Sequence, residues 1–229
     1  MRIGTWNLNA DESGRSDAFL ASLDGDVLLL TEPPRGLTLP GYQLRFSEGT
    51  MARGQAFAAV ATRTEPQSSV QPHPASIGSQ VGGTTFLASV LPWRSAKDAD
   101  GFPGTSQGER TREAVETLAD DWPPGRVVWG GDLNHELTGR IGAGSKTGRD
   151  AILRLMRDRD LQVPTSVLGA ATGYGSVNHI ALPSDWTIMG VARHVAEVDG
   201  QRLSDHDAYV VEVNLPGDPT VSGAFRVTG

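Results

Sequence analysis

Val127-Val128-Trp129-Gly130-Gly131-Asp132-Leu133-Asn134 is the stretch of sequence that decides the fold. Its apolar half predicts a buried strand that ends where the polar residues begin. Gly130 and Gly131 permit another backbone to approach closely. Asp132 and Asn134 are two residues apart in an extended chain, so they share one face. An Asx turn that closes the strand would account for the same residues, so this motif alone leaves both interpretations open.

A second polar cluster stands near the end of the chain, where Ser204-Asp205-His206 precedes the apolar run Ala208-Tyr209-Val210-Val211. Neighbouring side chains diverge in an extended chain, so Asp205 could bind a metal ion while His206 contacts a substrate. Histidine titrates near neutral pH and can protonate a leaving oxygen. A surface turn is the competing interpretation. Polar groups at strand ends are typical of a catalytic cleft carried by a rigid sheet.

Three more polar residues lie in or directly after predicted strands. Asn7 lies near the end of the first strand, and Glu32 follows the buried run Leu28-Leu29-Leu30. Prolines at 33 and 34 stop that strand, which leaves Glu32 at its end. Glu32 either caps a turn or belongs to a site, whereas Asn7 alone is better explained as a strand-end hydrogen bonder. Asn178 alone is explained by strand packing.

The remaining pattern predicts more strands than helices. Strands are expected at residues 2–8, 26–30, 42–46, 55–62, 84–91, 126–130, 177–182, 186–191 and 208–213, and helices at residues 16–23, 109–120 and 150–159. Residues 65–80 suggest a loop or edge segment, and residues 92–108 a long polar loop on the rim of a site. The lack of strict strand–helix alternation favours sheets packed on each other with helices outside. We expect one domain over residues 1–215 and a peripheral tail over residues 216–229.

The composition excludes several classes of protein. The 229 residues carry a formal net charge of −7, which argues against a protein that coats nucleic acid but permits a local basic rim. The chain has no cysteine, so a disulfide scaffold, a Cys-ligated zinc site and a thiol nucleophile are excluded. No signal-peptide region and no run of membrane-spanning length is visible. We expect a soluble cytoplasmic protein that acts as a monomer.

Two loops carry candidates for substrate contacts. Residues 137–149 contain three basic residues and no acidic one, so this segment is a candidate phosphate-binding loop, with a merely solvated loop as the alternative. The long polar loop adds an aromatic and a basic residue. The candidates for substrate binding are Trp93, Arg94, Arg140, Lys146 and Arg149.

Five segments in order resemble the motifs of the endonuclease/exonuclease/phosphatase superfamily, which includes DNase I-like nucleases, exonuclease III-like repair enzymes, and sphingomyelin and inositol phosphatases. The segments are Thr5-Trp6-Asn7-Leu8-Asn9, Leu30-Thr31-Glu32, Gly130-Gly131-Asp132-Leu133-Asn134, Val177-Asn178-His179-Ile180 and Leu203-Ser204-Asp205-His206. They extend over nearly the whole chain. The resemblance implies a four-layer α/β sandwich, in which two mainly antiparallel sheets pack face to face with helices outside.

The resemblance also implies a cofactor, Mg²⁺ or Mn²⁺, bound at the top of the sheets. Glu32 would be the principal metal ligand, with Asn7 and Asp205 nearby. A hard cation prefers such oxygen ligands.

The catalytic roles implied by the resemblance fall on three residues. Asp132 would orient or deprotonate the attacking water, Asn134 would hold the phosphate, and His206 would stabilise the pentacoordinate transition state. The chain departs from the family pattern at Asn178, where an aspartate usually pairs with the catalytic histidine. An amide can orient the ring but cannot stabilise an imidazolium by charge. Whether another acid takes this place is left open, and the candidates are Asp185, Asp199 and Asp207.

A second departure lies after the strand at residues 84–91. Leu91-Pro92-Trp93 stands where many members have a histidine or tyrosine. The resemblance therefore implies that one phosphate contact is missing or has moved.

We expect from these residues a divalent-metal-dependent phosphodiester hydrolase that acts as a nuclease, with a phosphoester substrate and possible binding of nucleic acid. Two alternatives stay open. The acidic net charge favours a phosphatase or phosphodiesterase that acts on a small or lipid-linked phosphoester. The departures at Asn178 and Trp93 are compatible with a catalytically weak member that serves as a binding module.

Overall fold

The computed structural model describes residues 1–229 except 12–13, 170–174, 218–225 and 229. The strands of the described part are β1 (Arg2–Asn7), β2 (Val27–Thr31), β3 (Gln43–Phe46), β4 (Ala58–Thr62), β5 (Ser68–Val70), β6 (Ser76–Val81), β7 (Thr84–Val90), β8 (Arg126–Asp132), β9 (Leu161–Gln162), β10 (Asn178–Pro183), β11 (Thr187–His194), β12 (Glu197–Val198), β13 (Gln201–Arg202), β14 (Ala208–Asn214) and β15 (Arg226–Thr228). Its helices are α1 (Arg15–Ser22), α2 (Gln107–Asp120) and α3 (Lys146–Asp158), with 3₁₀ turns η1 (Asp98–Asp100) and η2 (Pro164–Val167). None of these helices is both long and apolar enough to cross a bilayer.

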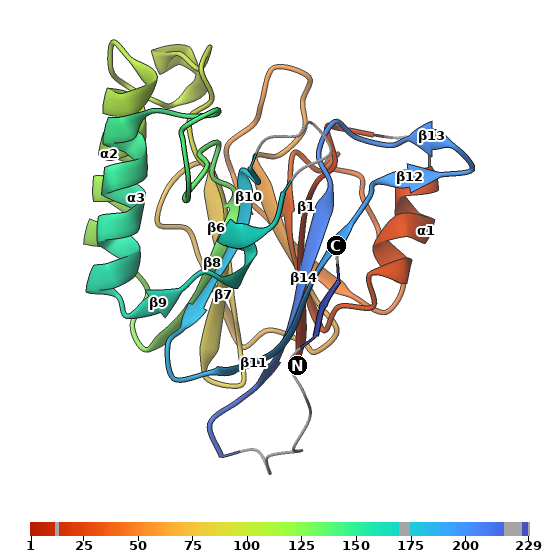
Figure 1. Cartoon of the computed structure of the whole chain (residues 1–229). Coiled ribbons are helices and arrows are strands. Elements are labelled where there is room, and N and C mark those ends of the chain that lie inside the picture. Colours follow the sequence, from red (N-terminus) through yellow and green to blue (C-terminus); the bar gives the residue numbers. More distant parts are fainter. Residues whose placement is uncertain (12–13, 170–174, 218–225, 229) are drawn as a thin grey trace.

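Two sheets pack face to face between layers of helix (Figure 1). The first sheet has the order β15-β11-β14-β1-β2-β4-β3, and the second has the order β5-β6-β7-β8-β10-β9. Most neighbouring strands are antiparallel, and the parallel pairs are β1–β2, β7–β8 and β11–β15. Helices α2 and α3 cover the second sheet, and α1 lies on the far side of the first (Figure 1). The predicted four-layer α/β sandwich is confirmed.

Three layers of apolar side chains hold the sandwich together. Strand alternation distributes them, because Val128 packs between the two sheets while its neighbours Val127 and Trp129 pack toward α2 and α3. Trp6 and Phe19 meet edge to face in the third layer, between the first sheet and α1. Strand β8 is thus buried on both faces, which explains its continuous apolar run.

Helix α3 starts four residues earlier than the prediction of residues 150–159. Ser145 caps it, because the Ser145 hydroxyl accepts a hydrogen bond from the Gly148 amide at 3.0 Å. As a consequence, Lys146 and Arg149 belong to a helix rather than to the predicted loop.

Three segments without a predicted strand lie at sheet edges, and one of them is β9 at an edge of the second sheet. Residues 65–80, interpreted as a loop or edge segment, contribute β5 and most of β6 at one edge of the second sheet. In the predicted tail, β15 pairs with β11 as the edge strand of the first sheet.

The topology brings several strand ends to one edge of the sandwich. The parallel strands β1 and β2 end side by side, with Asn7 opposite Thr31. Strand β10 runs antiparallel to β8, so its first residue, Asn178, lies opposite the last residue of β8, Asp132. Strand β14 is antiparallel to β1, so the residues just before it reach the same edge. The polar motifs therefore meet there.

Candidate active site

The Asn7 side chain links two carboxylates at this edge. Its Nδ2 atom donates to Oε1 of Glu32 at 3.0 Å and to Oδ2 of Asp132 at 3.0 Å. Its Oδ1 atom accepts from the backbone N–H of Asn9 at 2.9 Å. All heteroatoms of the Asn7 amide are engaged, so Asn7 fixes both acids relative to each other.

Backbone geometry sets the direction of Asp132. Gly131 has φ of 124°, and a Cβ atom there would lie 2.3 Å from the carbonyl oxygen of Ser89, so only glycine fits. Asp132 is almost fully buried, and its Oδ1 accepts from the backbone N–H of Asn134 at 3.0 Å. Asn134 has φ of 51°, and its Nδ2 donates to the carbonyl of Leu91 at 2.9 Å. Left-handed backbone at Asn134 is typical of strained functional positions.

His206 stands over Asp132. Its Nε2 atom lies 3.8 Å from Oδ2 of Asp132 and 3.9 Å from Oδ2 of Asp205. The backbone on either side of the ring is fixed, because the N–H of His206 donates to the Ser204 hydroxyl at 3.1 Å and its carbonyl accepts from the Trp6 indole at 3.1 Å. The Asp205 side chain is 74% exposed, so it reaches solvent while His206 faces inward.

Asn178 is the partner of the His206 ring. Its amide nitrogen lies 2.8 Å from Nδ1 of His206. In this arrangement Nδ1 accepts and the ring proton is on Nε2, facing the carboxylates. The Asn178 Oδ1 atom is then buried without a hydrogen-bond partner. An exchange of the amide oxygen and nitrogen would reverse the tautomer, so the orientation of Asn178 decides which histidine nitrogen carries the proton.

The three acids considered as substitutes at position 178 lie elsewhere. Asp185 pairs with Arg126 at the opposite end of β8, at 2.7 Å. Asp199 lies in the turn between β12 and β13. Asp207 is buried and accepts from Arg193 at 2.9 Å and from Arg202 at 2.6 Å. Burial alone would raise the pKa of Asp207, but the hydrogen bonds from Arg202 and the Ala196 N–H, together with both guanidinium charges, lower it.

Sequence reasoning missed Arg53, which lies beside Glu32. Its Nη2 atom is 4.0 Å from Oε2 of Glu32 and donates to the carbonyl and to Oδ1 of Asn9, at 3.0 and 2.7 Å. Arg53 precedes Gly54, which has φ of 85°. A glycine turn after an arginine is a weak signal, and only the folded loop shows that the guanidinium reaches the carboxylates.

No family model matches the sequence, and no curated protein sequence matches it. Solved structures do match. The 3′ phosphatase NExo from Neisseria bound to a product DNA hairpin aligns with a TM-score of 0.70 and 15% identity over 94% of this chain and 100% of that one. An endonuclease/exonuclease/phosphatase from Beutenbergia cavernae aligns with a TM-score of 0.67 and 17% identity over 96% of this chain and 73% of that one. The endonuclease domain of TRAS1, a telomere-specific non-LTR retrotransposon, aligns with a TM-score of 0.56 and 16% identity over 92% of this chain and 96% of that one.

The chain has the endonuclease/exonuclease/phosphatase fold. This outcome confirms the fold that the resemblance of the five short motifs implied. At identities of 15–17% the likeness establishes the fold and leaves the activity to be argued from the site.

In this endonuclease/exonuclease/phosphatase fold, the charged form of Glu32 is disfavoured by its surroundings. Burial raises the pKa of Glu32, and the neighbouring Asp132 raises it further, against the lowering effect of the hydrogen bond from Asn7. The carboxylates of Glu32 and Asp132 both accept from one Asn7 nitrogen, and the nearest arginine, the exposed Arg53, has its Nη2 4.0 Å from Oε2 of Glu32. Such a site favours an added positive charge.

Glu32→Gln is therefore expected to stabilise the metal-free protein. The raised pKa means that the folded state binds the Glu32 proton more tightly than the unfolded state, so stability falls as pH rises from 4.5 through the folded-state pKa. Glutamine keeps an acceptor for Asn7 and carries no charge. In EDTA at pH 7 we expect the melting temperature to rise by about 2–4 °C, equivalent to roughly 1 kcal/mol, with little difference at pH 4. A lower melting temperature at pH 7 would contradict this account.

The donor set fits a hard divalent cation in part. Among the described residues, no three His, Asp or Glu side chains cluster closely enough to hold a metal ion by themselves. The edge instead offers the two carboxylates of Glu32 and Asp132, with Asp205 in reach of solvent. Asn7 presents its Nδ2 nitrogen to these acids and its Oδ1 to the Asn9 N–H, so in this arrangement it positions the two carboxylates and has no free oxygen to offer a cation. Waters commonly complete the coordination of Mg²⁺.

The predicted substrate residues have different surroundings. Trp93 and Glu32 line one cleft of about 280 Å³. Arg94 and Arg140 are exposed. Lys146 pairs with Asp150 at 2.6 Å, and Arg149 donates to the carbonyls of Gly139 and Thr138 at 2.8 and 3.3 Å. Of the five candidates, the structure brings Trp93 into a cleft with Glu32, whereas Lys146 and Arg149 already have partners within the chain.

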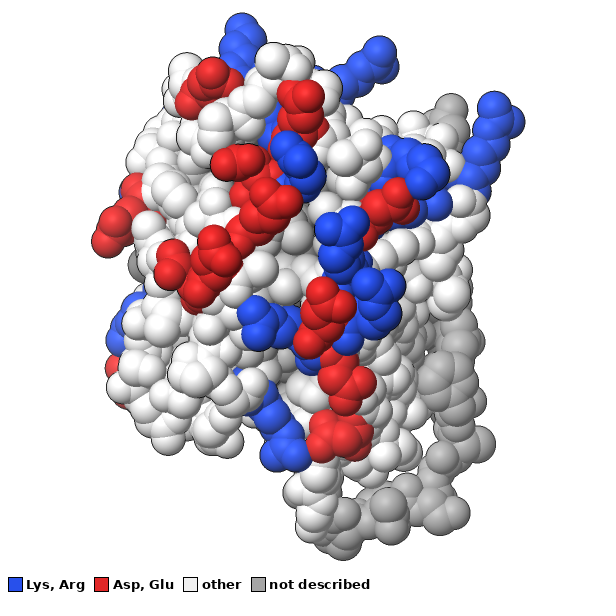
Figure 2. Space-filling model, turned by 90° about the vertical axis from the view of Figure 1, so that its left-hand side faces the viewer, with Lys and Arg blue, Asp and Glu red and all other residues white. Residues whose placement is uncertain are grey.

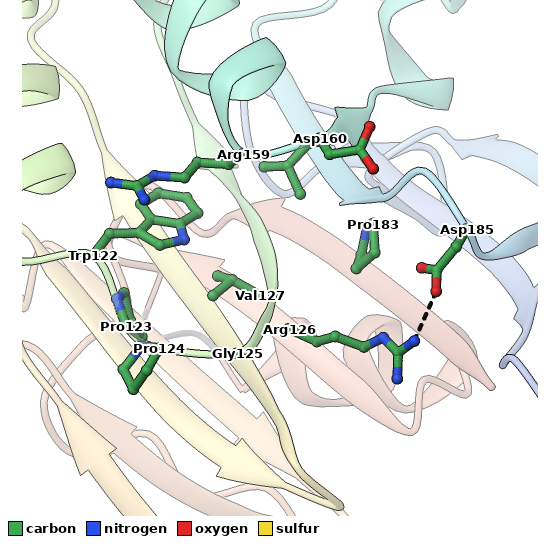
Figure 3. A pocket seen from close by; sticks show the side chains of 11 residues that line it. Trp122, Pro123, Pro124, Gly125, Arg126, Val127, Arg159, Asp160, Pro183 and Asp185 are labelled. Atoms are coloured by element: carbon green, nitrogen blue, oxygen red, sulfur yellow. Dashed lines mark hydrogen bonds and ion pairs between the residues drawn. The ribbon is translucent and has the colours of Figure 1, made fainter.

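A cleft of about 450 Å³ lies at the other end of the second sheet and holds none of these residues (Figure 3). Arg126, which begins β8, pairs there with Asp185, and the Arg159 guanidinium lies over the Trp122 ring at 5.6 Å from its centroid (Figure 3). Both arginines are thus already engaged. Volume alone does not identify an active site, and the carboxylates of this fold lie at the opposite strand ends.

Proposed function

We propose that the chain is a divalent-metal-dependent phosphodiester hydrolase that acts as a nuclease. One observation carries the proposal: a single asparagine holds two acids at strand ends, and a histidine with its own amide partner faces one of them. The fold adds support, because matching structures include a 3′ phosphatase with a DNA product and an endonuclease domain.

The proposed mechanism assigns each side chain one task. Asp132, held by Asn7 and the backbone N–H of Asn134, accepts the proton of an attacking water. The water oxygen bonds to phosphorus as the bond from phosphorus to the leaving oxygen breaks, and the leaving oxygen takes a proton from solvent. His206, with its proton on Nε2, donates a hydrogen bond to a phosphoryl oxygen that gains charge in the transition state. Asn178 keeps the ring in that tautomer.

A divalent cation, Mg²⁺ or Mn²⁺, would be held by Glu32 with Asp132 and Asp205 near it, and would supply charge neutralisation at the phosphate. Asn134 uses its Nδ2 atom for the Leu91 carbonyl, which keeps its backbone in the left-handed conformation and its side chain at the edge. The Arg53 guanidinium, beside Glu32, could bind a second anionic oxygen of the substrate phosphate.

The test of metal dependence is hydrolysis in the presence and absence of a chelator. We expect cleavage with Mg²⁺ or Mn²⁺, complete loss in EDTA, and recovery when excess metal is restored. Single-stranded DNA, duplex DNA, RNA, a small phosphodiester and a 3′-phosphomonoester should be compared under each condition. Full activity in EDTA would exclude the metal, and inactivity toward every phosphoester with every divalent metal would favour a binding module.

A small-substrate phosphatase is the second candidate, favoured by the net charge of −7. The outer face of α2 and α3 carries acidic and basic side chains in neighbouring bands, without a continuous basic stripe (Figure 2). Binding of long duplex DNA through phosphate contacts weakens steeply with salt. A KM that is nearly independent of salt between about 50 and 200 mM would therefore favour this second candidate.

A further inference from the structure

We propose that the cleft beside Glu32 is a stacking subsite that binds one nucleobase of the substrate against Trp93, next to the phosphate to be cleaved. The inference rests on the proposed function, since it places the base relative to the carboxylates. Glu32, Arg53, Gln55 and Trp93 line this cleft, which has a volume of about 280 Å³. A ligand held there would lie beside Glu32, which is also the principal residue of the candidate metal site.

Trp93 is a rigid platform. Its ring meets Phe102 edge to face, with centroids 5.9 Å apart, and Phe102 is fully buried against His73 and Phe57. The carbonyl of the preceding residue, Pro92, accepts from the Gln107 side chain at 3.0 Å. The ring contact with Phe102 and the hydrogen bond to Pro92 therefore anchor the loop, and little entropy is lost when a ligand stacks on the ring.

Gln55 supplies the polar edge of the cleft. Gln55 is only 4% exposed, and its buried Oε1 atom has no hydrogen-bond partner in the chain. A buried amide with an unused acceptor is costly unless a ligand completes it. The oxygen and nitrogen of a side-chain amide exchange by a simple rotation, so Gln55 can offer either to the edge of a base. Nucleobases carry donors and acceptors on such edges.

The lining selects a base over a lipid chain. Acyl chains need continuous apolar walls, but Glu32, Arg53, Gln55 and Asp100 interrupt those formed by Met51 and Trp93. An aromatic platform with polar groups at its rim and a cation beside it is typical of sites that stack single nucleotides. A base in this cleft has left its duplex stack, so the inferred substrate class is single-stranded nucleic acid or an unpaired terminal nucleotide.

The test compares a short single-stranded DNA with the same strand in which one residue next to the cleaved bond lacks its base. Wild-type enzyme with Mg²⁺ or Mn²⁺ should prefer the complete strand by about tenfold or more, the scale of one base–aromatic stack. Trp93→Ala should remove the preference by slowing cleavage of the complete strand only, and Trp93→Phe should keep most of it. Trp122→Ala, a matched change in the distant cleft, should leave the preference unchanged.

A binding measurement separates failure of the subsite from failure of the proposed function. In EDTA, oligothymidylate should quench tryptophan fluorescence in wild type and in Trp122→Ala, and much less in Trp93→Ala. If no strand is cleaved with any metal but the quenching depends on Trp93, the subsite stands and the nuclease proposal fails. If strands are cleaved while Trp93→Ala changes neither preference nor quenching, or slows both strands equally, the subsite is wrong.

Discussion

Asp132→Asn is expected to lower the turnover of phosphodiester cleavage by about 10³-fold, within the range for loss of a general base. Both carboxylate oxygens of Asp132 accept hydrogen bonds, one from the Asn7 side chain and one from the backbone N–H of Asn134. An asparagine can satisfy only one of these donors and cannot accept a proton from water near neutral pH. The loss should fall on kcat, because the interaction with the water forms only as the bond is attacked.

The measurement is steady-state cleavage at saturating metal, with circular dichroism to show that the variant folds. Asp185→Asn is the matched control, since its acid lies in an exposed pair with Arg126 at the opposite end of β8. We expect the control to remain within about twofold of wild type, because exposed ion pairs contribute little. If Asp132→Asn keeps more than a tenth of the wild-type rate, water activation belongs to another residue.

The strand-end residues could be predicted from the sequence because their position depends on local signals. Apolar runs that stop at Asn7, Glu32 and Asp132 predict strand ends, and the parallel pairing of β1 with β2 brings two of these ends together. The fold follows from the same pattern, since strands outnumber helices and do not alternate strictly with them along the chain. The contact between Asn178 and His206 was implied by the resemblance alone, and the structure supplies its distance.

Loop residues could not be predicted, because tertiary contacts place them. The approach of Arg53 to Glu32 depends on the turn at Gly54 and on the hydrogen bond from its guanidinium to the distant Asn9 carbonyl. Gln55 gives no signal at all until its burial is known. The early start of α3 was missed because Ser145 lies in a glycine-rich stretch that resembles a loop, although its hydroxyl caps the helix.

His206→Ala is expected to lower turnover by about 10²–10³-fold, the usual cost of losing one hydrogen-bond donor to an oxygen that gains charge in the transition state. With its proton on Nε2, the His206 ring faces the carboxylate edge, where Nε2 lies 3.8 Å from Oδ2 of Asp132. Removal of the ring also leaves the Asn178 amide without its partner. Cleavage rates at saturating substrate, with thermal melting as the check on folding, measure the effect.

The variants of Asn178 show whether the amide sets the tautomer. Asn178→Ala should lower kcat by roughly tenfold, the equivalent of one hydrogen bond of about 1.4 kcal/mol, because the ring loses its fixed orientation. Asn178→Asp moves the proton to Nδ1, since a carboxylate can only accept, and adds a charge that stabilises the doubly protonated ring. We expect nitrogen NMR to find the His206 proton on Nε2 in wild type and on Nδ1 in Asn178→Asp. A turnover for Asn178→Asp far above wild type would identify the natural protein as a weakened enzyme, whereas an unchanged turnover in Asn178→Ala would show that the amide does not position the ring.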